Sequence, residues 1–358
     1  MAKGETVPTA HSVLVVSVGD PRGGLAQVAE RTAAAMSLQG RAALYKADFS
    51  SPRIVAIARE MSRLRKAAKN YDVVVLQVSP HHWARGSVLA GLLQAAWAHL
   101  ALFRKTVAVM HDTPDRGLRL SSVYSRAIGL IHWTLAKRIV YLSHAERFQA
   151  GLAGMGCDVQ VVPLYIETRS VSPLPESTDR TGLRLAVVGF LDRNKDPLFA
   201  LEVLKRVEGA TLTFLGGPLS EDAAIAADLR REIKRQGLED RVTITGYLTE
   251  EELDVELGRI EIGLCLYRRA STSASVTTLL GARRPVVASR LKIFCEYAAI
   301  APRAIRVVDR DPAAIALAIA DIARGPADWA GELDDLIHDR SLPNFGHGMW
   351  RAAGGPRS

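Results

Sequence analysis

The chain has 358 residues, 48% of them apolar and 23% charged, which excludes a disordered or fibrous protein and fits a globular protein of about two domains. The net charge is +8, and residues 1–170 hold 21 Lys and Arg against 11 Asp and Glu, so the first half attracts an anionic membrane surface, a nucleic acid or a phosphorylated substrate. The aromatic content is 6% without a nucleic-acid-binding motif, which argues against nucleic acid, and three widely separated cysteines argue against a disulfide framework or a structural zinc site.

The first half alternates short apolar strands with helical segments. Residues 13–18 are rich in β-branched side chains and precede a glycine-containing turn and a helix at residues 25–38. Further strands are expected at residues 72–78, 106–110, 138–142 and 159–164. Residues 83–103 are expected to form a long apolar helix, whose unbroken stretch is shorter than the ~18–20 residues that span a bilayer. The alternation predicts a parallel, doubly wound sheet.

One predicted helix, residues 54–69, concentrates the positive charge. Its apolar residues recur at helical spacing, and the remaining face carries Arg59, Arg63, Arg65, Lys66 and Lys69. A solvated helix face and docking on anionic lipid both explain this pattern. Because the N-terminus lacks the apolar run of a secretory signal, we expect a cytoplasmic protein that either stays soluble or attaches peripherally to the inner face of the membrane.

The polar, proline-containing stretch at residues 170–182 is expected to be a linker. After it the alternation restarts, with strands expected at residues 185–189, 211–215, 242–246, 262–266, 285–289 and 305–308. The sequence therefore predicts two Rossmann-like domains that face each other across a cleft, at residues 1–169 and 183–340. The weakly patterned tail at residues 341–358 either packs back on the first domain or frays.

Polar and glycine residues follow several of these strands. Gly23 and Gly24 follow the first strand and open a helix, where free backbone N–H groups suit a phosphate, although a plain structural turn is the alternative. Arg193 and Lys195 follow the first strand of the second half, where open α/β sheets bind ligands, and two cations there suit a pyrophosphate. Two solvated loop residues are the alternative.

A hydroxyl-rich segment, residues 271–278, precedes a short predicted helix. Its donors suit an anion at the helix N-terminus, and ordinary N-capping is the alternative. His111 ends a strand of the first half, where a lone histidine is more often structural. His81 and His82, which are neighbours in the sequence and follow another strand, have no Glu or Cys at a ligand spacing, so no metal site is expected.

Taken together, these segments resemble the family-4 retaining glycosyltransferases of GT-B architecture, the group 1 glycosyl transferases. The order and spacing of the matching motifs carry the resemblance, which runs loosely over nearly the whole chain. The motifs are Gly23-Gly24, Val109-Met110-His111-Asp112, Leu142-Ser143, Val161-Val162-Pro163-Leu164, Val188-Gly189, Lys195-Asp196-Pro197, Leu215-Gly216-Gly217-Pro218, residues 242–253 and residues 281–289.

The resemblance implies roles for individual residues. The glycine loop at Gly24 and the Lys195 side chain are expected to grip a donor diphosphate, His111 to lie beside the donor sugar, and the backbone of Tyr247 and Leu248 to hold the base. The catalytic candidates are His111, Arg193 and Lys195. The donor-binding candidates are Gly23, Gly24, Gly189, Gly216, Tyr247, Leu248, Ser273, Ser275, Val276, Thr277 and Thr278.

The chain departs from the family pattern at two places. Phe190 stands where the family usually has Arg, and Arg193 is a nearby replacement for that charge. The two carboxylates of the E-x7-E motif, counted back from Pro285, fall on Ala270 and Thr278. Because those carboxylates normally hold the donor sugar and the ribose, the choice of sugar cannot be inferred. Either the hydroxyls and backbone N–H groups of residues 271–278 bind the diphosphate and ribose, or catalysis is reduced or lost.

The sequence thus predicts a metal-independent hexosyltransferase that uses a nucleotide-diphosphate sugar as donor and needs no cofactor. The expected acceptor is a lipid-linked molecule or a polysaccharide precursor. A nucleotide-sugar epimerase of the same fold and an inert GT-B scaffold that binds a partner are the alternatives.

Overall fold

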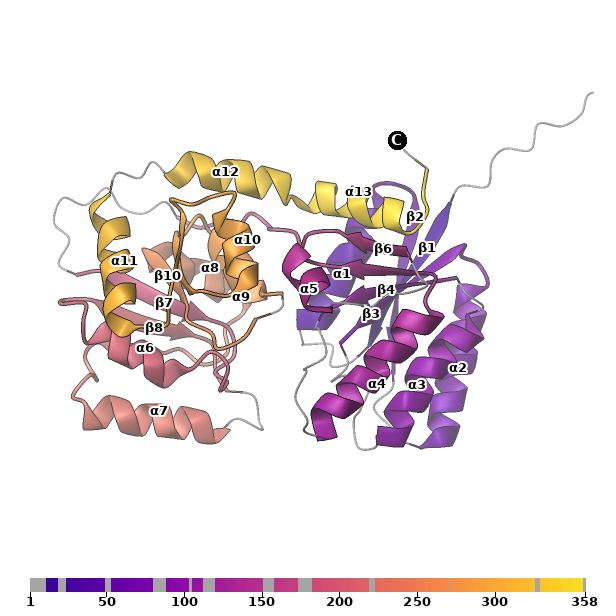
Figure 1. Cartoon of the computed structure of the whole chain (residues 1–358), viewed down its shortest axis with the longest axis horizontal. Coiled ribbons are helices and arrows are strands. Elements are labelled where there is room, and N and C mark those ends of the chain that lie inside the picture. Colours follow the sequence, from indigo (N-terminus) through magenta and orange to yellow (C-terminus); the bar gives the residue numbers. More distant parts are fainter. Residues whose placement is uncertain are drawn as a thin grey trace, which may run out of the picture. The chain divides into compact units, whose positions relative to one another are not determined.

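The computed structural model describes residues 11–18, 24–48, 53–79, 88–102, 105–111, 120–150, 158–172, 182–218, 223–270, 272–325 and 329–356. The chain forms two compact units, one made of Met1–Leu164 with Leu342–Ser358 and the other of Tyr165–Ser341. Each unit is an α/β domain in which helices flank a parallel, six-stranded sheet (Figure 1).

The first domain contains a sheet of strand order β2-β1-β3-β4-β5-β6. Its strands are β1 (Ser12–Val18), β2 (Arg41–Ala47), β3 (Val73–Val78), β4 (Thr106–Met110), β5 (Arg138–Tyr141) and β6 (Asp158–Val161). Its helices are α1 (Gly24–Ser37), α2 (Ile54–Ala68), α3 (Val88–Ala101), α4 (Leu120–Leu135), α5 (His144–Ala150) and α13 (Leu342–Ala352). In the central register, Val15 lies opposite Leu44 of β2 and Val75 of β3. β1, β3 and β4 are buried along their whole length, as expected of parallel strands covered on both faces.

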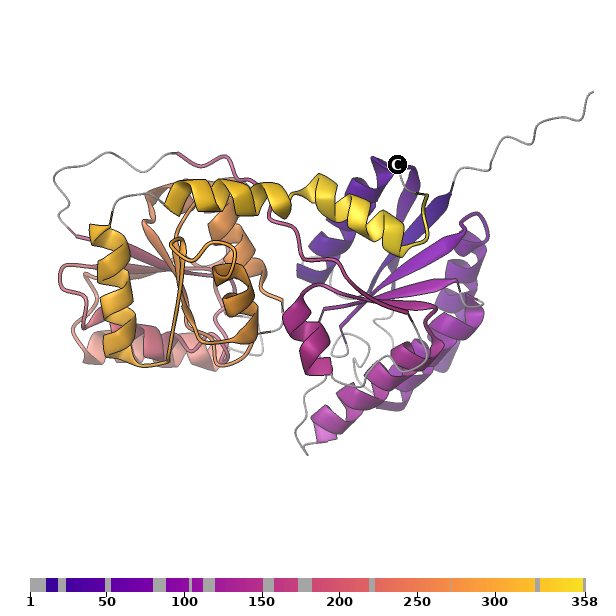
Figure 2. The same ribbon diagram turned by 45° about the horizontal axis from the view of Figure 1, so that its top comes forward.

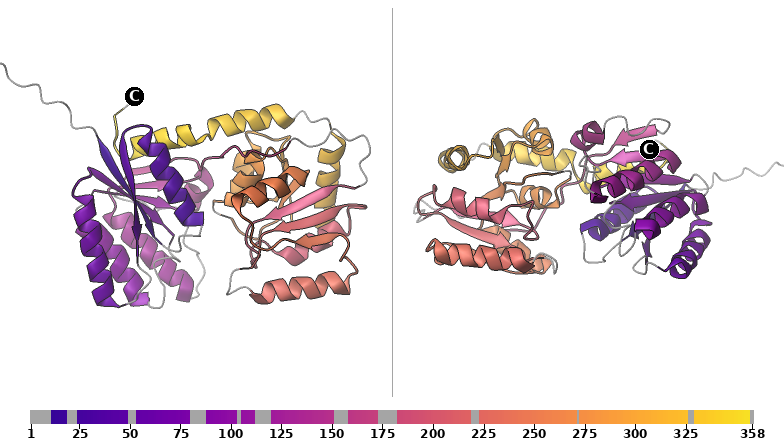
Figure 3. Two further views of the ribbon diagram at one scale, coloured as in Figure 1. Left: turned by 180° about the vertical axis from the view of Figure 1, so that it is seen from behind. Right: turned by 60° about the horizontal axis from the view of Figure 1, so that its bottom comes forward.

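Helices α2, α3 and α4 cover one face of this sheet. Their inward side chains, such as Met61 of α2, Ala95 of α3 and Ile128 of α4, share one core cluster with Leu76 and Met110 of the strands. Figure 3 shows α1 on the opposite face. This division follows from the strand order. The right-handed connection from β1 to β2 runs toward one edge of the sheet, whereas the connections from β2 to β3 and from β3 to β4 run toward the other edge, so their helices lie on opposite faces.

Helix α13 returns the C-terminal segment to the first domain, where it packs against α1 (Figure 2). A side chain at Gly346 would lie 2.6 Å from the backbone oxygen of Ala35, so glycine permits the close approach. The Trp350 ring meets His11 edge-on at 5.1 Å, and Arg138 donates to the carbonyl of Arg351 at 3.3 Å. The segment is therefore an ordered part of this domain, although its sequence is glycine-rich.

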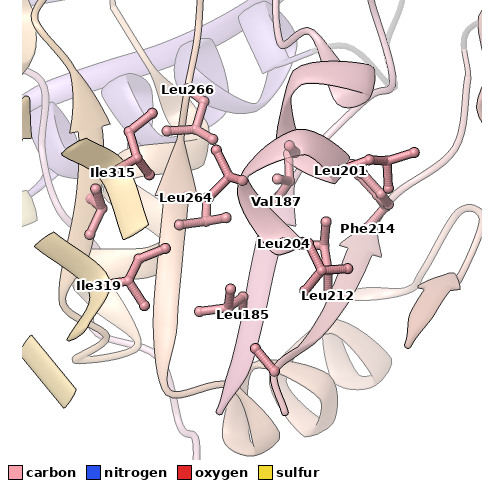
Figure 4. Close-up of a cluster of buried hydrophobic side chains, with 14 of the residues drawn as sticks. Leu185, Val187, Leu201, Leu204, Leu212, Phe214, Leu264, Leu266, Ile315 and Ile319 are labelled. Carbon is pink, nitrogen blue, oxygen red and sulfur yellow. The ribbon is translucent and has the colours of Figure 1, made fainter. Parts of the chain in front are cut away.

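The second domain contains a sheet of strand order β12-β11-β10-β7-β8-β9. Its strands are β7 (Arg184–Val188), β8 (Thr211–Leu215), β9 (Val242–Ile244), β10 (Ile262–Cys265), β11 (Val286–Ser289) and β12 (Ile305–Val308). Its helices are α6 (Pro197–Leu204), α7 (Ala223–Arg235), α8 (Glu250–Arg259), α9 (Ala274–Gly281), α10 (Lys292–Ala298), α11 (Pro312–Arg324) and α12 (Trp329–Asp339). Figure 4 shows Leu201 and Leu204 of α6 and Ile315 and Ile319 of α11 around the side chains of the central strands. This core holds β7, β8 and β10 together, so their carboxyl ends lie at one edge of the sheet.

The division between the domains differs from the predicted boundary at residue 169. The Ile166 N–H donates to the carbonyl of Arg340 at 2.6 Å, and the Arg169 N–H donates to the carbonyl of Gly281 at 2.9 Å. The Arg169 guanidinium also pairs with Asp254 at 2.5 Å and with Glu250 at 2.7 Å. Residues 165–169 therefore belong to the second domain. Of the predicted linker at residues 170–182, residues 173–181 lie outside the described residues.

Six elements were missing from the sequence prediction: β2, α4, α8, α10, α12 and α13. β2 lies at the edge of its sheet, and most of its residues are only partly buried, so it lacks the continuous apolar run of the central strands.

Candidate functional site

The loops that follow β7, β8 and β9 are pressed together by two glycines. Gly189 has φ +95° and Gly216 has φ +145°, backbone conformations that side chains rarely adopt. A side chain at Gly216 would collide with the carbonyl of Gly189. The Gly189 N–H donates to the carbonyl of Leu215 at 2.9 Å, and the Gly216 N–H donates to the Thr245 hydroxyl at 3.2 Å. Three loops thus bring backbone close together at the carboxyl edge of the sheet.

Lys195 lies at this edge with its side chain only 13% exposed. Its ammonium is 3.3 Å from the carboxylate of Asp192 and 5.8 Å from the ring centre of Tyr267. A side-chain carbon at Gly189 would lie 3.4 Å from the Lys195 ammonium and 2.9 Å from the Ser275 hydroxyl. The Lys195 ammonium, the Ser275 hydroxyl and the Gly189 backbone therefore converge on one place.

The loop that carries Lys195 is fixed by the loop after β10. Asn194 exchanges side-chain bonds with the backbone of Arg269, donating to its carbonyl at 2.7 Å and accepting from its N–H at 2.8 Å. Asp196 accepts from Arg268 at 2.9 Å and also pairs with Arg310. These ion pairs hold Asp196 at φ +50°, an uncommon conformation that starts α6. The position of Lys195 is thus set by the surrounding structure.

Arg193, the second predicted cation, lies on the same loop but is exposed. It forms no ion pair with any residue that the structure describes. The structure therefore places Lys195 with the glycine loops and leaves Arg193 in solvent.

The hydroxyl-rich segment divides between two tasks at the start of α9. Ser273 caps the helix by accepting from the Val276 N–H at 3.3 Å, and the Thr277 hydroxyl donates to the carbonyl of Ala274 at 3.0 Å. The Val276 side chain is buried in the domain. Ser275 is the hydroxyl that faces Gly189, and Thr278 is half-buried. Part of the predicted anion-binding set therefore performs ordinary capping.

Tyr267, at the end of β10, was not singled out by the sequence. It is buried, and its ring meets that of Phe294 edge-on at 5.6 Å. Burial raises the pKa of Tyr267 well above its ordinary value and raises the pKa of the neighbouring Cys265 thiol to about 12. Both groups stay protonated at neutral pH. Tyr267 thus offers an uncharged aromatic floor beneath the Lys195 ammonium rather than an acid or a base.

The loop after β9 supplies a second, more open part of this edge. Gly217 lies against the loop, since a side-chain carbon there would be 3.5 Å from the Tyr247 backbone nitrogen. Tyr247 is 74% exposed, and Leu248 is half-buried. Thr249 then closes a capping box with Glu252 at the start of α8. The backbone of Tyr247 therefore lies beside the glycine-rich turn that follows β8.

In the first domain, His111 follows the last residue of β4. Its backbone N–H donates to the carbonyl of Val78 at 2.8 Å, and its ring Nε2 is 2.5 Å from the side-chain oxygen of Gln77. Gln77 is fully buried and donates to the Thr32 hydroxyl of α1 at 3.4 Å, which donates to the carbonyl of Val28 at 2.6 Å. The chain of donors assigns the Nε2 proton to His111, so the neutral ring keeps Nδ1 as its acceptor. Gln77 is the partner that sequence reasoning did not find.

Gly24, the first residue of α1, borders open space, since no described atom lies within 4 Å of a side-chain carbon built there. Its partner in the predicted glycine loop, Gly23, lies outside the described residues. Open backbone at a helix N-terminus is what an anion-binding loop requires.

The predicted amphipathic helix forms as α2, but its apolar stripe is not available to lipid. Ile57, Met61, Leu64 and Ala68 all belong to the core beneath the helix. The cations lie outward, with Arg59, Arg63, Arg65 and Lys66 exposed. The charged face of α2 is therefore accessible, and the expected docking of this helix on anionic lipid would use that face while most of the apolar stripe stays in the core.

Part of the chain is similar in sequence to a known protein family. Residues 182–324, which cover most of the second domain, match the family model described as glycosyl transferases group 1. No curated protein matches the chain in sequence.

Solved structures match over nearly the whole chain. Alr3699/HepE from Anabaena, in a crystal structure with UDP-glucose, superposes with a TM-score of 0.74 at 13% identity over 96% of this chain and 99% of that chain. The fold is GT-B. Sucrose-phosphate synthase from Thermosynechococcus elongatus gives 0.69 at 15% identity, over 96% of both chains. A UDP-forming α,α-trehalose-phosphate synthase from Burkholderia vietnamiensis gives 0.70 at 11% identity, over 97% of this chain and 99% of that chain.

Two further observations concern a metal site and a membrane-spanning helix. Among the described residues, no group of three His, Cys, Asp or Glu side chains is arranged to hold a metal ion. In that same part of the chain, no helix has the length and apolar character needed to cross a membrane.

Proposed function

We propose that this GT-B protein is a glycosyltransferase that moves a sugar from a nucleotide-diphosphate sugar to an acceptor hydroxyl with retention of configuration. The observation that carries the proposal is the group 1 match over residues 182–324, in the domain where Lys195, Ser275 and the Gly189 turn converge. The complexes of HepE with UDP and UDP-glucose support a nucleotide-sugar donor.

Lys195 would hold the donor diphosphate. Among the described residues, its ammonium forms one ion pair, at 3.3 Å to Asp192, so a bound diphosphate would compete with a single carboxylate. A diphosphate carries more negative charge than one carboxylate and would form charge-assisted hydrogen bonds with the ammonium. The Ser275 hydroxyl and the backbone around Gly189 would complete this phosphate site, while the backbone of Tyr247 and Leu248 would hold the base.

The proposed reaction needs no protein nucleophile. The bond from the anomeric carbon to the diphosphate oxygen breaks as the acceptor oxygen bonds to the same face of the sugar. The acceptor proton passes to the departing phosphate oxygen, so atoms and charge balance. Lys195 would stabilise the negative charge that develops on the diphosphate, and His111 would lie beside the donor sugar. We propose that this chemistry requires no metal, and full turnover in excess EDTA tests that statement.

We further propose that the acceptor is a lipid-linked molecule or a polysaccharide precursor. The protein would bind this acceptor at an anionic membrane surface. The excess positive charge of residues 1–170 supports this choice.

The second candidate function is that of an inert GT-B scaffold, and the observation that favours it is the pair Ala270 and Thr278 where the family has carboxylates. A thermal-shift screen of nucleotide-diphosphate sugars finds the donor, because a ligand at 100 times its Kd stabilises the fold by about 2.7 kcal/mol. Turnover of that donor then decides. A glycosylated acceptor supports the transferase, an altered donor sugar an epimerase, and binding without turnover the scaffold.

A further inference from the structure

Helix α3 is apolar on both of its faces. Its sequence, VLAGLLQAAWAHLA, contains no Asp, Glu, Lys or Arg. One face packs on the sheet and includes Ala95, Ala98 and Leu102 of the core cluster. The opposite face presents a continuous row of large apolar side chains, namely Leu89 (63% exposed), Leu93 (38%), Trp97 (38%) and Leu100 (63%). These four residues, the α3 stripe, follow helical spacing along about three turns.

Cations lie on the neighbouring helix. Helices α2, α3 and α4 lie side by side on one face of the sheet (Figure 1). The outward face of α2 and its last turn carry Arg59, Arg63, Arg65, Lys66 and Lys69. The single carboxylate in the α2 sequence, Glu60, is buried; it accepts from the Tyr45 hydroxyl at 2.9 Å and pairs with Arg63 at 3.5 Å, so it offsets one of these five cations. The outward side of α2 is therefore strongly positive. On the far side of α3, Val123 and Leu130 of α4 are also exposed.

We propose that the α3 stripe inserts into the headgroup and acyl boundary of an anionic bilayer, with the α2 cations on the lipid phosphates. A convex row of leucines with one tryptophan is the pattern of an interfacial helix, since tryptophan favours the headgroup level. Charge complementarity selects anionic lipid, because the flanking helix offers cations without an exposed carboxylate of its own. The apolar contact thus belongs to α3 and the electrostatic attraction to α2. The proposal does not depend on sugar transfer and holds equally for an inert scaffold.

The experiment measures partition of the full chain onto vesicles of phosphatidylglycerol and phosphatidylcholine by sedimentation. Binding is expected to require the anionic lipid and to weaken with salt. At low salt, each Lys or Arg near the surface contributes about five-fold, so removing three cations lowers partition by about 100-fold. The variant is Arg59→Ser, Lys66→Ser and Lys69→Ser. Its matched control removes three exposed cations of the second domain, Arg230→Ser, Arg231→Ser and Lys234→Ser.

The stripe is tested separately. Leu89→Ser, Leu93→Ser and Leu100→Ser together are expected to lower partition by about 100-fold, since each inserted leucine contributes several-fold. The matched control replaces exposed apolar residues of the second domain, Leu198→Ser, Val255→Ser and Leu317→Ser. Thermal unfolding checks that every variant is folded. Brominated lipids should quench Trp97, and the quenching should be lost in Trp97→Phe.

Three outcomes would overturn the proposal. The wild-type chain could stay in the supernatant with anionic vesicles at low salt. The leucine variant could bind as well as the wild type, which would remove α3 from the contact. Sedimentation velocity could show a dimer that the leucine substitutions abolish, with no vesicle binding, which would assign the stripe to a second copy of the chain.

Discussion

A buried pair of histidines should make the first domain sensitive to mild acid. His99 of α3 and His132 of α4 lie 2.7 Å apart, from Nε2 to Nδ1, and the other ring nitrogen of His99 is 2.7 Å from the Thr106 hydroxyl. Burial lowers the pKa of His99 to about 4, and burial together with the neighbouring ring lowers the pKa of His132 well below its ordinary value. Both rings are therefore neutral in the folded domain at neutral pH.

The sign and size of the effect follow from linkage. Below pH 6.5 the unfolded chain takes up protons that the folded domain refuses, so the free energy of unfolding falls as the pH falls. One histidine whose pKa drops from 6.5 to about 4 removes about 2 kcal/mol of stability between pH 7 and pH 5. His132, whose pKa is also lowered, should add to this loss in the same direction. Carboxylates with lowered pKa values, such as Glu332, lose their contribution at lower pH, so this window reports the histidines.

The assay is urea unfolding at pH 7 and pH 5, followed by tryptophan fluorescence. Trp329 is the single tryptophan in the sequence of the second domain, so a Trp329→Phe background makes the signal report the first domain alone. The double variant His99→Leu with His132→Phe should lose most of the difference between the two pH values, whatever its absolute stability. His144→Gln, which changes an exposed histidine, is the control. An equal difference in the wild type and the double variant would refute the reasoning.

The remaining predictions concern the candidate site. Lys195→Ala should weaken nucleoside-diphosphate binding by about 1.5–3 kcal/mol, measured by calorimetry against the exposed control Lys205→Ala, and unchanged affinity would remove Lys195 from the site. His111→Ala should lower turnover far more than nucleotide affinity, whereas equal losses with a lower melting temperature would indicate a structural histidine. Gln77→Leu should lower turnover and leave nucleotide affinity intact, because it removes the acceptor that orients His111. Gly216→Ala should destabilise the second domain by more than about 1 kcal/mol, seen in thermal unfolding, because its φ is +145° and its new methyl meets the Gly189 carbonyl.

The strands that the sequence predicted well are those buried on both faces. Runs such as VLVVSV and DVVVLQV contain little besides apolar residues, because central parallel strands have no solvent face. The edge strand β2, with the sequence RAALYKA, has a solvent face and no such run. Helix α13 was missed because glycine disfavours helices in isolation. In the folded domain Gly346 is what lets α13 approach α1, so tertiary packing reverses the local preference.

The sequence likewise predicted some residues of the candidate site and missed others. Lys195 and the glycines follow strands directly, and strand ends are visible in the sequence. The roles of Tyr267 and Asn194 arise from contacts between loops that lie far apart in the chain, which the sequence does not reveal. The role of Gln77 arises from the direction its side chain takes in a fully buried strand. On the face of the first sheet that α2, α3 and α4 cover, periodicity revealed the apolar stripe of α2. It did not show that this stripe is buried in the core of the domain. The sequence of α3 has no charged residue on any side, so its pattern does not reveal which face is exposed.

If the two carboxylates of the family motif are replaced by Ala270 and Thr278, as we propose, nucleotide binding and turnover become separate questions. Ala270 and Thr278 flank the start of α9 and bring no charge to it. Two acidic residues close to Lys195 in sequence are already engaged, Asp192 by Lys195 itself and Asp196 by two arginines. The proposed diphosphate site consists of Lys195, Ser275 and the backbone around Gly189, whereas the carboxylates of the family motif would hold the sugar hydroxyls. We therefore expect nucleotide affinity to depend on Lys195 whether the chain is a transferase or a scaffold. Turnover depends on whether hydroxyls and backbone amides replace the missing acids.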